Sequence, residues 1–414
     1  MKYTVIDLFS GCGGLTEGFL KTNKFEFLAH VEWEKPMVET LRANLHKRWN
    51  ESEESVNNKV VHFDVQLIDE LIHGNWSNSS VEQYGKTNGK IVQEKGLNGL
   101  IAERSVDVII GGPPCQAYSL AGRAQDPNSM KDDYRNYLFE SFVAIVKYYR
   151  PHIFVFENVP GMLSAKPGDK YVVERIKDAF FNIGYKIRDI KELKNSIYNA
   201  SSFGVAQDRK RVILFGVSIE SNIELEDLYA ALDAERQDSI FTVHDVLARL
   251  PKFYPLKSAY KDGRRNISHE AEANSSNIKY HESRYHNARD IAVFKQWVSH
   301  NMNYYSTKEK LAFYEKISGR KSNHNKYRNL EWDKPSPTIV SHLYKDGLMF
   351  IHPDAEQARS ITVKESAILQ SFPNDYIFLG SDAYKYKMIG NAVPVLMGEA
   401  IAKAVANVLM ENKK

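Results

Sequence analysis

Apolar and amphipathic stretches alternate over the first half of the chain. Short runs rich in Val, Ile and Phe are typical of buried strands, whereas the segments between them have the apolar spacing of helices. The strand-like runs are YTVIDLF (3–9), FEFLAHVE (25–32), KVVHFD (59–64), SVDVIIGG (105–112), HIFVFENV (152–159) and RVILFGV (211–217). The helical stretches are TEGFLKT (16–22), KPMVETLRANL (35–45), NYLFESFVAIVKYYR (136–150) and YVVERIKDAFFNIGY (171–185). This alternation predicts an α/β fold with a mostly parallel, doubly wound, Rossmann-like sheet.

The pattern breaks after residue 216. Residues 217–345 are rich in His, Asn, Tyr, Lys and Arg, and they include the basic stretches KDGRRN (261–266) and GRKSNHNKYRN (319–329). Apolar helical patterns then return in SITVKESAILQSF (360–372) and in PVLMGEAIAKAVANVLM (394–410), which begins with proline. We expect a catalytic domain over 1–216 with 385–414 packing back onto it, and a smaller recognition domain with a hinge over 217–384.

Composition narrows the class of protein. The chain has 414 residues, 43% hydrophobic residues, a net charge of +3 and two cysteines. The hydrophobic content predicts a folded protein, and the low cysteine count fits a reducing cytosol. Because the net charge is small, a polyanionic partner would have to bind a local basic patch. There is no signal-peptide pattern and no apolar run of about 18 residues, so we expect no membrane segment. The polar stretch NWSNSSVEQYGKTNG (75–89) is expected to be a loop, and the surrounding segment 66–104 receives no role.

The unusual residues of the first half follow the predicted strands. In an open parallel sheet, ligands bind beyond the carboxyl ends of the strands. The turn DLFSGCGG (7–14) follows the first strand, and Gly11, Gly13 and Gly14 are expected to let a ligand approach the backbone. Glu32 ends the second strand, where an acidic side chain can accept hydrogen bonds from a ribose diol, and Asp64 ends the third. Taken singly, each is equally compatible with a tight connection, a solvated strand end or a turn.

Three further residue types are candidates for nucleophilic, acid-base and anion-binding roles. Cys115 follows the fourth strand in GGPPCQAYSLAGR (111–123), where two prolines stiffen the loop. A thiolate presented in this way is a nucleophile, although a structural thiol stays possible and no histidine lies nearby in sequence. Glu157 ends a buried strand and is a candidate proton donor. Arg209 and Arg211, two residues apart, are expected to share a face and to hold a carbonyl or phosphate oxygen.

Together these motifs resemble those of the DNA (cytosine-5)-methyltransferases of bacterial restriction-modification systems. The similar segments are DLFSGCGG, GGPPCQAYS, FENVPG, QDRKR, ESAILQSFP and GNAVP, in that order, over roughly 1–216 and 330–410. The resemblance implies that Cys115 attacks C6 of a flipped-out cytosine, and that Glu157 contacts N3. It also implies that Arg209 and Arg211 hold the base or a phosphate, and that S-adenosylmethionine supplies the methyl group and leaves as S-adenosylhomocysteine. The implied cofactor pocket consists of Phe9, Gly11, Gly13, Gly14, Glu32, Trp33, Asp64, Pro114 and Asn391.

The resemblance further implies double-stranded DNA as the partner of the middle region. Basic residues on its glycine-punctuated loops are candidates for phosphate and base contacts. They are Arg264, Arg265, Arg320, Lys321, Lys326 and Arg328. We expect a cytoplasmic, nucleoid-associated monomer without a metal site, functionally paired with a restriction endonuclease.

Three alternatives stay open at this stage. The same chemistry could act on tRNA, although the Pro-Cys-Gln sequence and the sizeable middle region favour DNA. The chain could be a catalytically inert DNA-binding relative, against which the intact Cys115, Glu157, Arg209 and Arg211 argue. The glycine-rich turn alone would also fit a nucleotide-dependent oxidoreductase, which would bind a nicotinamide cofactor.

Overall fold

The computed structural model describes residues 2–114, 138–166, 169–273, 276–325, 327–345 and 347–412. Cys115 and Lys326, two residues to which the sequence assigns roles, lie outside these ranges.

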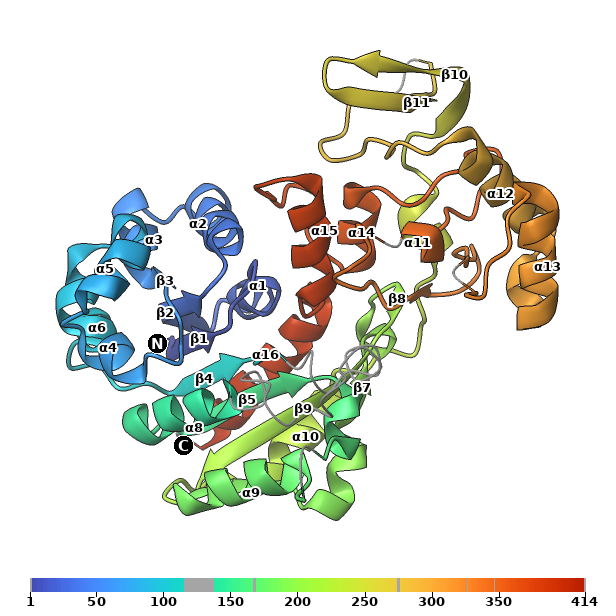
Figure 1. The fold of residues 1–414 in the computed structure, drawn as a ribbon. Helices are drawn as coiled ribbons and strands as arrows, with labels where there is room; N and C mark the ends of the chain where they lie inside the picture. The colour runs from blue at the N-terminus through green and yellow to red at the C-terminus, as the bar shows by residue number, and fades with distance from the viewer. Residues whose placement is uncertain are drawn as a thin grey trace.

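A mixed sheet forms the centre of the larger domain (Figure 1). Its strands run in the order β3–β2–β1–β4–β5–β9–β6, and β7 also pairs with β9. They are β1 (Tyr3–Leu8), β2 (Phe25–Glu32), β3 (Val60–His62), β4 (Val108–Gly111), β5 (Ile153–Asn158), β6 (Tyr185–Ile187), β7 (Ile197–Asn199) and β9 (Lys210–Ser218). The first five pair in parallel, whereas β9 runs antiparallel to β5, β6 and β7. The predicted α/β class is therefore confirmed, and the sixth predicted strand has the opposite direction to the others.

Helices cover both faces of this sheet. Strands β1, β4 and β5 are buried along their whole length, as their nearly continuous apolar sequence requires. Side chains alternate between two cores: Val5 of β1 packs with α1 (Gly14–Lys21), α10 (Leu225–Ala234) and α16 (Val395–Glu411). The neighbouring Ile6 packs with the core of the opposite face. That face is covered by α8 (Leu138–Tyr149) and α9 (Val172–Asn182), while α2 (Lys35–Trp49) and α3 (Glu53–Lys59) pack near β3.

Residues 66–104 are helical, which corrects the expected loop over 75–89. They contain α4 (Ile68–His73), α5 (Asn78–Tyr84), the 3-10 turn η1 (Gly85–Thr87) and α6 (Lys90–Ile101). Helix α5 begins at a Ser77 cap, whose side chain accepts a hydrogen bond from the Ser80 N–H. The sequence of this segment is mostly polar, but two aromatic residues anchor it. Trp76, which precedes α5, and Tyr84, its last residue, are both buried in the sheet core.

The smaller domain follows α10 and packs around apolar clusters of its own. Its elements are α11 (Val243–Leu247), the hairpin β10 (Phe253–Asp262) and β11 (Arg265–Ala271), α12 (Ala288–Ser299), α13 (Thr307–Ser318), α14 (Val363–Leu369) and α15 (Asp382–Asn391). Figure 1 shows the hairpin at the far end of this domain, with α12 and α13 beside it. Two short strands, β8 (Gln207–Asp208) and β12 (Ser336–Pro337), pair in parallel and tie the two domains together. Further 3-10 turns are η3 (Pro160–Ser164), η4 (Ile190–Ser196), η5 (Ala200–Phe203), η6 (Met302–Tyr304) and η7 (Gly347–Met349).

The domain limits differ from the expected ones at one point. Helix α10 buries Leu228 and Leu232 in the same core as β9, so the sheet domain continues beyond residue 216. Helix α16 packs against α1 as expected, with an ion pair between Lys21 Nζ and Glu399 Oε2 at 2.5 Å. Pro394 is the cap before α16 and not its first residue.

One helical stretch has the length and apolarity of a membrane span. An 18-residue window within 382–411 reaches a mean hydropathy of 1.5. However, 72% of that window is buried within the protein, and the chain leaves helical geometry between α15 and α16. This is the signature of a core helix, so the stretch gives only weak evidence for a membrane segment.

Candidate active site

The carboxyl ends of four neighbouring strands meet at one edge of the sheet. In the strand register, Leu8 of β1 pairs with Val31 of β2 and with Gly111 of β4, and Gly111 pairs with Phe156 of β5. The residues that follow each strand therefore converge, as the sequence predicts for Glu32, Pro114 and Glu157.

The three glycines of the turn have different surroundings. Gly11 has a φ of +56°, and a Cβ there would find open space within 4 Å. A Cβ at Gly13 would lie 2.6 Å from Leu41 Cδ1, and one at Gly14 would lie 2.4 Å from the carbonyl oxygen of Val393. Gly13 and Gly14 thus also let α1 pack closely against α2 and the start of α16.

Glu32 joins this turn to the end of β2. Its Oε2 accepts the Gly11 N–H at 2.8 Å, and its Oε1 accepts the Glu34 N–H at 2.7 Å. The residue is 8% exposed. Burial raises the pKa of the Glu32 carboxyl to about 7, although the two N–H groups act in the opposite direction. The side chain is thus a buried acceptor whose protonation changes near neutral pH.

The remaining candidates for the cofactor pocket surround Glu32. Trp33 is 53% exposed even though it follows a buried strand, and Phe9 is half-buried in the left-handed backbone region with a φ of +58°. Asp64 is half-buried, and its Oδ1 accepts the Gln66 N–H at 3.0 Å. Exposed aromatic rings next to buried carboxylates are the groups that an adenosine requires.

Glu157 lies against the start of the loop that leads to Cys115. A Cβ at Gly112 would lie 2.6 Å from Glu157 Oε2, so a larger residue there would displace this carboxylate. The neighbouring Asn158 donates from Nδ2 to the carbonyl oxygen of Pro113 at 3.4 Å. Pro114 is exposed at the end of the described segment.

The two arginines of QDRKR have different environments, contrary to the expectation that they share a face. Nε of Arg211 lies 2.7 Å from Glu157 Oε1, and burial lowers the pKa of Arg211 while Glu157 opposes this effect. Arg209 is 1% exposed and donates from Nη1 to the Ile339 carbonyl at 2.8 Å and from Nη2 to the Gly390 carbonyl at 2.9 Å. Burial, followed by the charge of Arg211, lowers the pKa of Arg209. Arg209 therefore holds the chain segments around it, because two of its donor groups bind backbone carbonyls.

The GNAVP segment ends α15 and lies against the glycine-rich turn. A Cβ at Gly390 would lie 2.3 Å from the carbonyl carbon of Val340, so this glycine permits a close backbone crossing. Asn391 is exposed at the last position of α15. The contact of Gly14 with Val393 brings this segment to the same sheet edge as Glu32.

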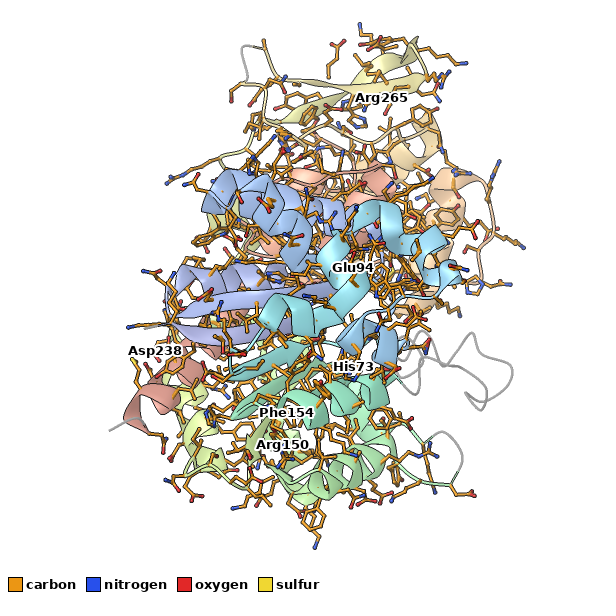
Figure 2. All side chains as sticks on the ribbon, turned by 90° about the vertical axis from the view of Figure 1, so that its left-hand side faces the viewer. His73, Glu94, Arg150, Phe154, Asp238 and Arg265 are labelled. Atoms are coloured by element: carbon orange, nitrogen blue, oxygen red, sulfur yellow. The ribbon has the colours of Figure 1, made fainter. Side chains whose placement is uncertain are left out.

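The described basic candidates of the smaller domain are all exposed. They are Arg264, Arg265, Arg320, Lys321 and Arg328. Arg264 and Arg265 lie at the turn of the β10–β11 hairpin, where Figure 2 labels Arg265 at the extremity of the molecule. Arg265 Nη1 lies 2.7 Å from Glu282 Oε2, and Lys321 Nζ lies 4.0 Å from Glu315 Oε1. The two basic stretches are therefore on different parts of the same domain.

Sequence reasoning missed several residues near the pocket. Glu34 caps α2, and both of its carboxylate oxygens lie 2.7 Å from Lys387 Nζ on α15, which links the pocket to the smaller domain. His62 and Thr87 contact the backbone and each other behind Trp33. No sequence motif marks them, although Glu34 directly follows the predicted pocket residues. Among the residues described, no group of three or more His, Cys, Asp or Glu side chains could hold a metal ion.

Solved structures of methyltransferases share this fold. A putative DNA modification methyltransferase encoded within a prophage (E. coli) matches with a TM-score of 0.58 and 22% identity, over 99% of this chain and all of that one. A methyltransferase of Entamoeba histolytica matches with a TM-score of 0.55 and 14% identity, over 99% of each chain. The fold is thus that of a methyltransferase of the Rossmann-like class.

Sequence comparison narrows this class. The family model described as C-5 cytosine-specific DNA methylase matches residues 3–75 and 74–407. A type II methyltransferase of Bacillus paralicheniformis is 34% identical, over 98% of this chain and 99% of that protein. A type II methyltransferase of Desulfomicrobium norvegicum is 31% identical, over 97% of this chain and 88% of that protein. The chain belongs to the C-5 cytosine-specific DNA methylases and is a DNA (cytosine-5)-methyltransferase.

Proposed function

We propose that the protein transfers the methyl group of S-adenosylmethionine to C5 of a flipped-out cytosine within a specific double-stranded DNA sequence. One observation carries this proposal. The carboxylate of Glu157 is paired with Arg211 at 2.7 Å and lies on the side of Gly112 where a Cβ would be, at the start of the segment that leads to Cys115 and at the same sheet edge as Glu32.

The residues around Glu32 fit S-adenosylmethionine. Each Glu32 oxygen accepts one backbone N–H and keeps a second acceptor position, which suits the two hydroxyl groups of a ribose. The space above Gly11 would admit the ligand next to these oxygens. Trp33 and Phe9 would pack on the adenine, Asp64 would accept from its amino group, and Pro114 and Asn391 would close the pocket. When bound, S-adenosylmethionine supplies the electrophilic methyl group.

The protein residues activate the other partner, the cytosine. C5 is a poor nucleophile because it belongs to an aromatic ring. Attack of the Cys115 thiolate forms a bond to C6 and moves electron density to C5, while Glu157 at N3 hydrogen-bonds or protonates the ring. After C5 has gained the methyl group, a base removes the C5 proton and the thiolate leaves by elimination. The thiol is restored, and S-adenosylhomocysteine is the second product.

Arg211 holds the carboxylate that meets the ring. Its Nε lies 2.7 Å from Glu157 Oε1, while its Nη1 donates to the Lys210 carbonyl at 2.8 Å, so the guanidinium is itself held in place. Arg209 acts indirectly, because its guanidinium hydrogen-bonds the backbone carbonyls of Ile339 and Gly390. We therefore assign Arg209 to positioning and not to contact with the base.

The smaller domain would bind and read the DNA. A cytosine stacked in a duplex is out of reach of Cys115, so it must be flipped out at a cost of about a few kcal/mol. Arg264, Arg265, Arg320, Lys321, Lys326 and Arg328 would contact phosphates and base edges. Lysine and arginine contacts to phosphate give affinity, and a few contacts to base edges give the sequence preference.

The biological setting follows from the relatives. Proteins that match over nearly the whole chain are named type II methyltransferases. We propose that this enzyme acts as a monomer on chromosomal DNA in a bacterial cytoplasm, and that it protects sites cut by a partner restriction endonuclease.

The test is to express the protein in a host without cytosine methylation and to sequence the genome after bisulfite treatment. We expect protected cytosines within one short recurring sequence, and none with Cys115→Ala. Methylation by Cys115→Ala would contradict the covalent mechanism. A genome without protected cytosines would contradict the DNA substrate, and purified enzyme would then be assayed on tRNA with labelled S-adenosylmethionine.

A further inference from the structure

The helices of residues 66–104, here called the insertion, form a fixed unit beside the cofactor edge of the sheet. Gly74, with a φ of +76°, closes α4, and a Cβ there would lie 2.3 Å from the carbonyl carbon of Glu94 in α6. Gly96, with a φ of +61°, kinks α6, and a Cβ there would lie 2.5 Å from the Gly74 backbone nitrogen. Such contacts fix α4 against α6. Figure 2, where His73 marks the end of α4 and Glu94 marks α6, shows these helices beside the sheet domain.

The insertion pairs with the edge strand β3 through one side chain. Asn88 Nδ2 donates to the His62 carbonyl at 2.9 Å, and Asn88 Oδ1 accepts the His62 N–H at 2.9 Å. The same amide donates to the Tyr84 carbonyl at 2.9 Å, which fixes it to the end of α5. Asn88 therefore makes the two backbone hydrogen bonds that a neighbouring strand would make to His62.

The His62 side chain connects the insertion to Trp33. Its Nε2 lies 2.9 Å from the Trp33 carbonyl oxygen, and its Nδ1 lies 2.7 Å from Thr87 Oγ1. A carbonyl only accepts, so Nε2 carries a proton. Burial lowers the pKa of His62. The Thr87 hydroxyl also donates to the Tyr84 carbonyl at 2.8 Å, so Thr87 joins the His62 ring to the end of α5.

Tyr84 of the insertion approaches the same pocket residues. Its ring packs edge-on against His62, with centroids 5.2 Å apart, and it is buried. Burial and then the charge of Asp64 raise the pKa of Tyr84, while a side-chain hydrogen bond with Trp33 lowers it. The Tyr84 hydroxyl thus hydrogen-bonds the side chain of Trp33 and is influenced by the charge of Asp64, the two residues assigned to the adenine.

Trp33 itself has little core packing to orient it, because 53% of it is exposed. A binding residue on a mobile backbone loses conformational freedom when the ligand binds, and prior ordering by its neighbours removes that loss. We propose that the insertion positions the Trp33 ring for the adenine of S-adenosylmethionine, with Thr87 and Asn88 acting through His62. The inference rests on the proposed function, which places the adenine at Trp33.

The experiment measures binding of S-adenosylhomocysteine to the full-length protein by calorimetry. The variants are Asn88→Ala and Thr87→Val, and the matched control is Asn98→Ala. Asn98 belongs to the same insertion, but its side chain donates to Tyr148 Oη at 2.8 Å and accepts from Tyr149 Oη at 2.9 Å, on α8. Loss of one or two buried hydrogen bonds should weaken binding by roughly 5- to 10-fold in Asn88→Ala and Thr87→Val. Binding by Asn98→Ala should stay within about twofold of wild type, since its hydrogen bonds do not reach His62 or Trp33.

Two further readouts separate positioning from general loss of stability. KM for S-adenosylmethionine should rise in Asn88→Ala and Thr87→Val while kcat changes by less than about twofold. Thr87→Ser, which restores the hydroxyl, should bind like wild type. If Asn88→Ala, Thr87→Val and Asn98→Ala all bind S-adenosylhomocysteine more weakly, each in proportion to its loss of Tm, the inference is overturned.

A Trp33→Ala variant separates this inference from the proposed function. If Trp33→Ala binds S-adenosylhomocysteine poorly while Asn88→Ala and Thr87→Val bind it normally, the positioning role is wrong, but the assignment of Trp33 to the cofactor pocket is supported. If wild type does not bind S-adenosylhomocysteine, the proposed cofactor is wrong, and the positioning role is overturned with it.

Discussion

Nε of Arg211 lies 2.7 Å from Oε1 of Glu157, and the two side chains are only 12% and 11% exposed. A buried pair of this kind is weak evidence for stability as a whole, but removal of one partner leaves an uncompensated charge. We therefore derive two separate predictions from this pair, one for kcat and one for the free energy of unfolding.

Glu157→Gln keeps the shape of the side chain and removes its charge. We expect kcat to fall by at least about 100-fold, because the ring loses its partner at N3. The unfolding free energy should fall by about 3 kcal/mol, since Arg211 stays buried without a counter-charge. A double variant with Arg211→Met should recover part of this stability but none of the activity. Normal kcat in Glu157→Gln would remove Glu157 from the mechanism.

Arg209→Met tests whether Arg209 binds the DNA. Two of its donor groups bind backbone carbonyls, so we expect a loss of unfolding free energy of about 2–4 kcal/mol from the unsatisfied Ile339 and Gly390 carbonyls. The slope of log K against log salt for DNA binding should stay unchanged, because no phosphate contact is lost. A slope smaller by about 1 would favour the sequence-based expectation that Arg209 holds a phosphate.

Glu32 predicts a pH dependence for cofactor binding. The hydroxyl groups of a ribose donate to the carboxylate, so the ligand prefers the ionised form, and the pKa of Glu32 in the free protein is about 7. Affinity for S-adenosylhomocysteine should therefore fall as pH drops through 7, by up to about tenfold per pH unit. Calorimetric titrations with S-adenosylhomocysteine from pH 6 to pH 8 measure this change in affinity. Glu32→Gln should bind weakly at every pH and lose this dependence, whereas an unchanged dependence would assign it to another group.

The same pKa affects stability in the opposite direction. The folded pKa lies above the unfolded one, so the folded protein binds the extra proton between about pH 4.5 and pH 7. The contribution of Glu32 to the unfolding free energy should fall by about 3 kcal/mol as pH rises over that range. Denaturant unfolding of wild type and Glu32→Gln should show a smaller decrease in the variant.

Gly11→Ala and Gly14→Ala should have different consequences. At Gly14 the added Cβ would meet the Val393 carbonyl at 2.4 Å, so we expect a loss of stability of about 2–3 kcal/mol. At Gly11 there is space for the Cβ, and the positive φ costs only about 1 kcal/mol. Gly11→Ala should instead weaken binding of S-adenosylhomocysteine, because the Cβ occupies the open space. Equal loss of Tm in both variants would contradict this division.

Arg264 tests the DNA-binding role of the hairpin. It is exposed at the β10–β11 turn, next to Arg265, which is paired with Glu282. Arg264→Ala should reduce the slope of log K against log salt by about 1 for every DNA sequence if it contacts phosphate. A change confined to one base position of the recognised site would indicate base readout instead. Binding identical to wild type would exclude the hairpin turn from the interface.

The sheet was predictable because its strands are buried on both faces. FEFLAHVE (25–32) is β2 in full, and the carboxyl ends of β1, β2, β4 and β5 do share one edge. Strand direction is not encoded in such runs, so the antiparallel course of β9 had no local signal. The helix over 78–84 was missed because its exposed face is polar and its apolar anchor, Tyr84, lies at its end.

The arginine pair shows why side-chain direction needed the structure. Alternation along one strand would place Arg209 and Arg211 on the same face. The strand is interrupted between β8, which ends at Asp208, and β9, which begins at Lys210, so Arg209 turns into the protein. The roles of Gly13 and Gly14 likewise depend on α2 and α16, which are distant in sequence.

The pairing of Asn88 with His62 has a consequence for the solubility of the protein. β3 lies at one end of the sheet, and edge strands with free N–H and C=O groups are templates for strand addition by other chains. Asn88 engages the N–H and C=O of His62, and both hydrogen bonds are internal to the monomer. The contact between Asn88 and His62 thus also occupies backbone groups of the edge strand and disfavours edge-to-edge aggregation there.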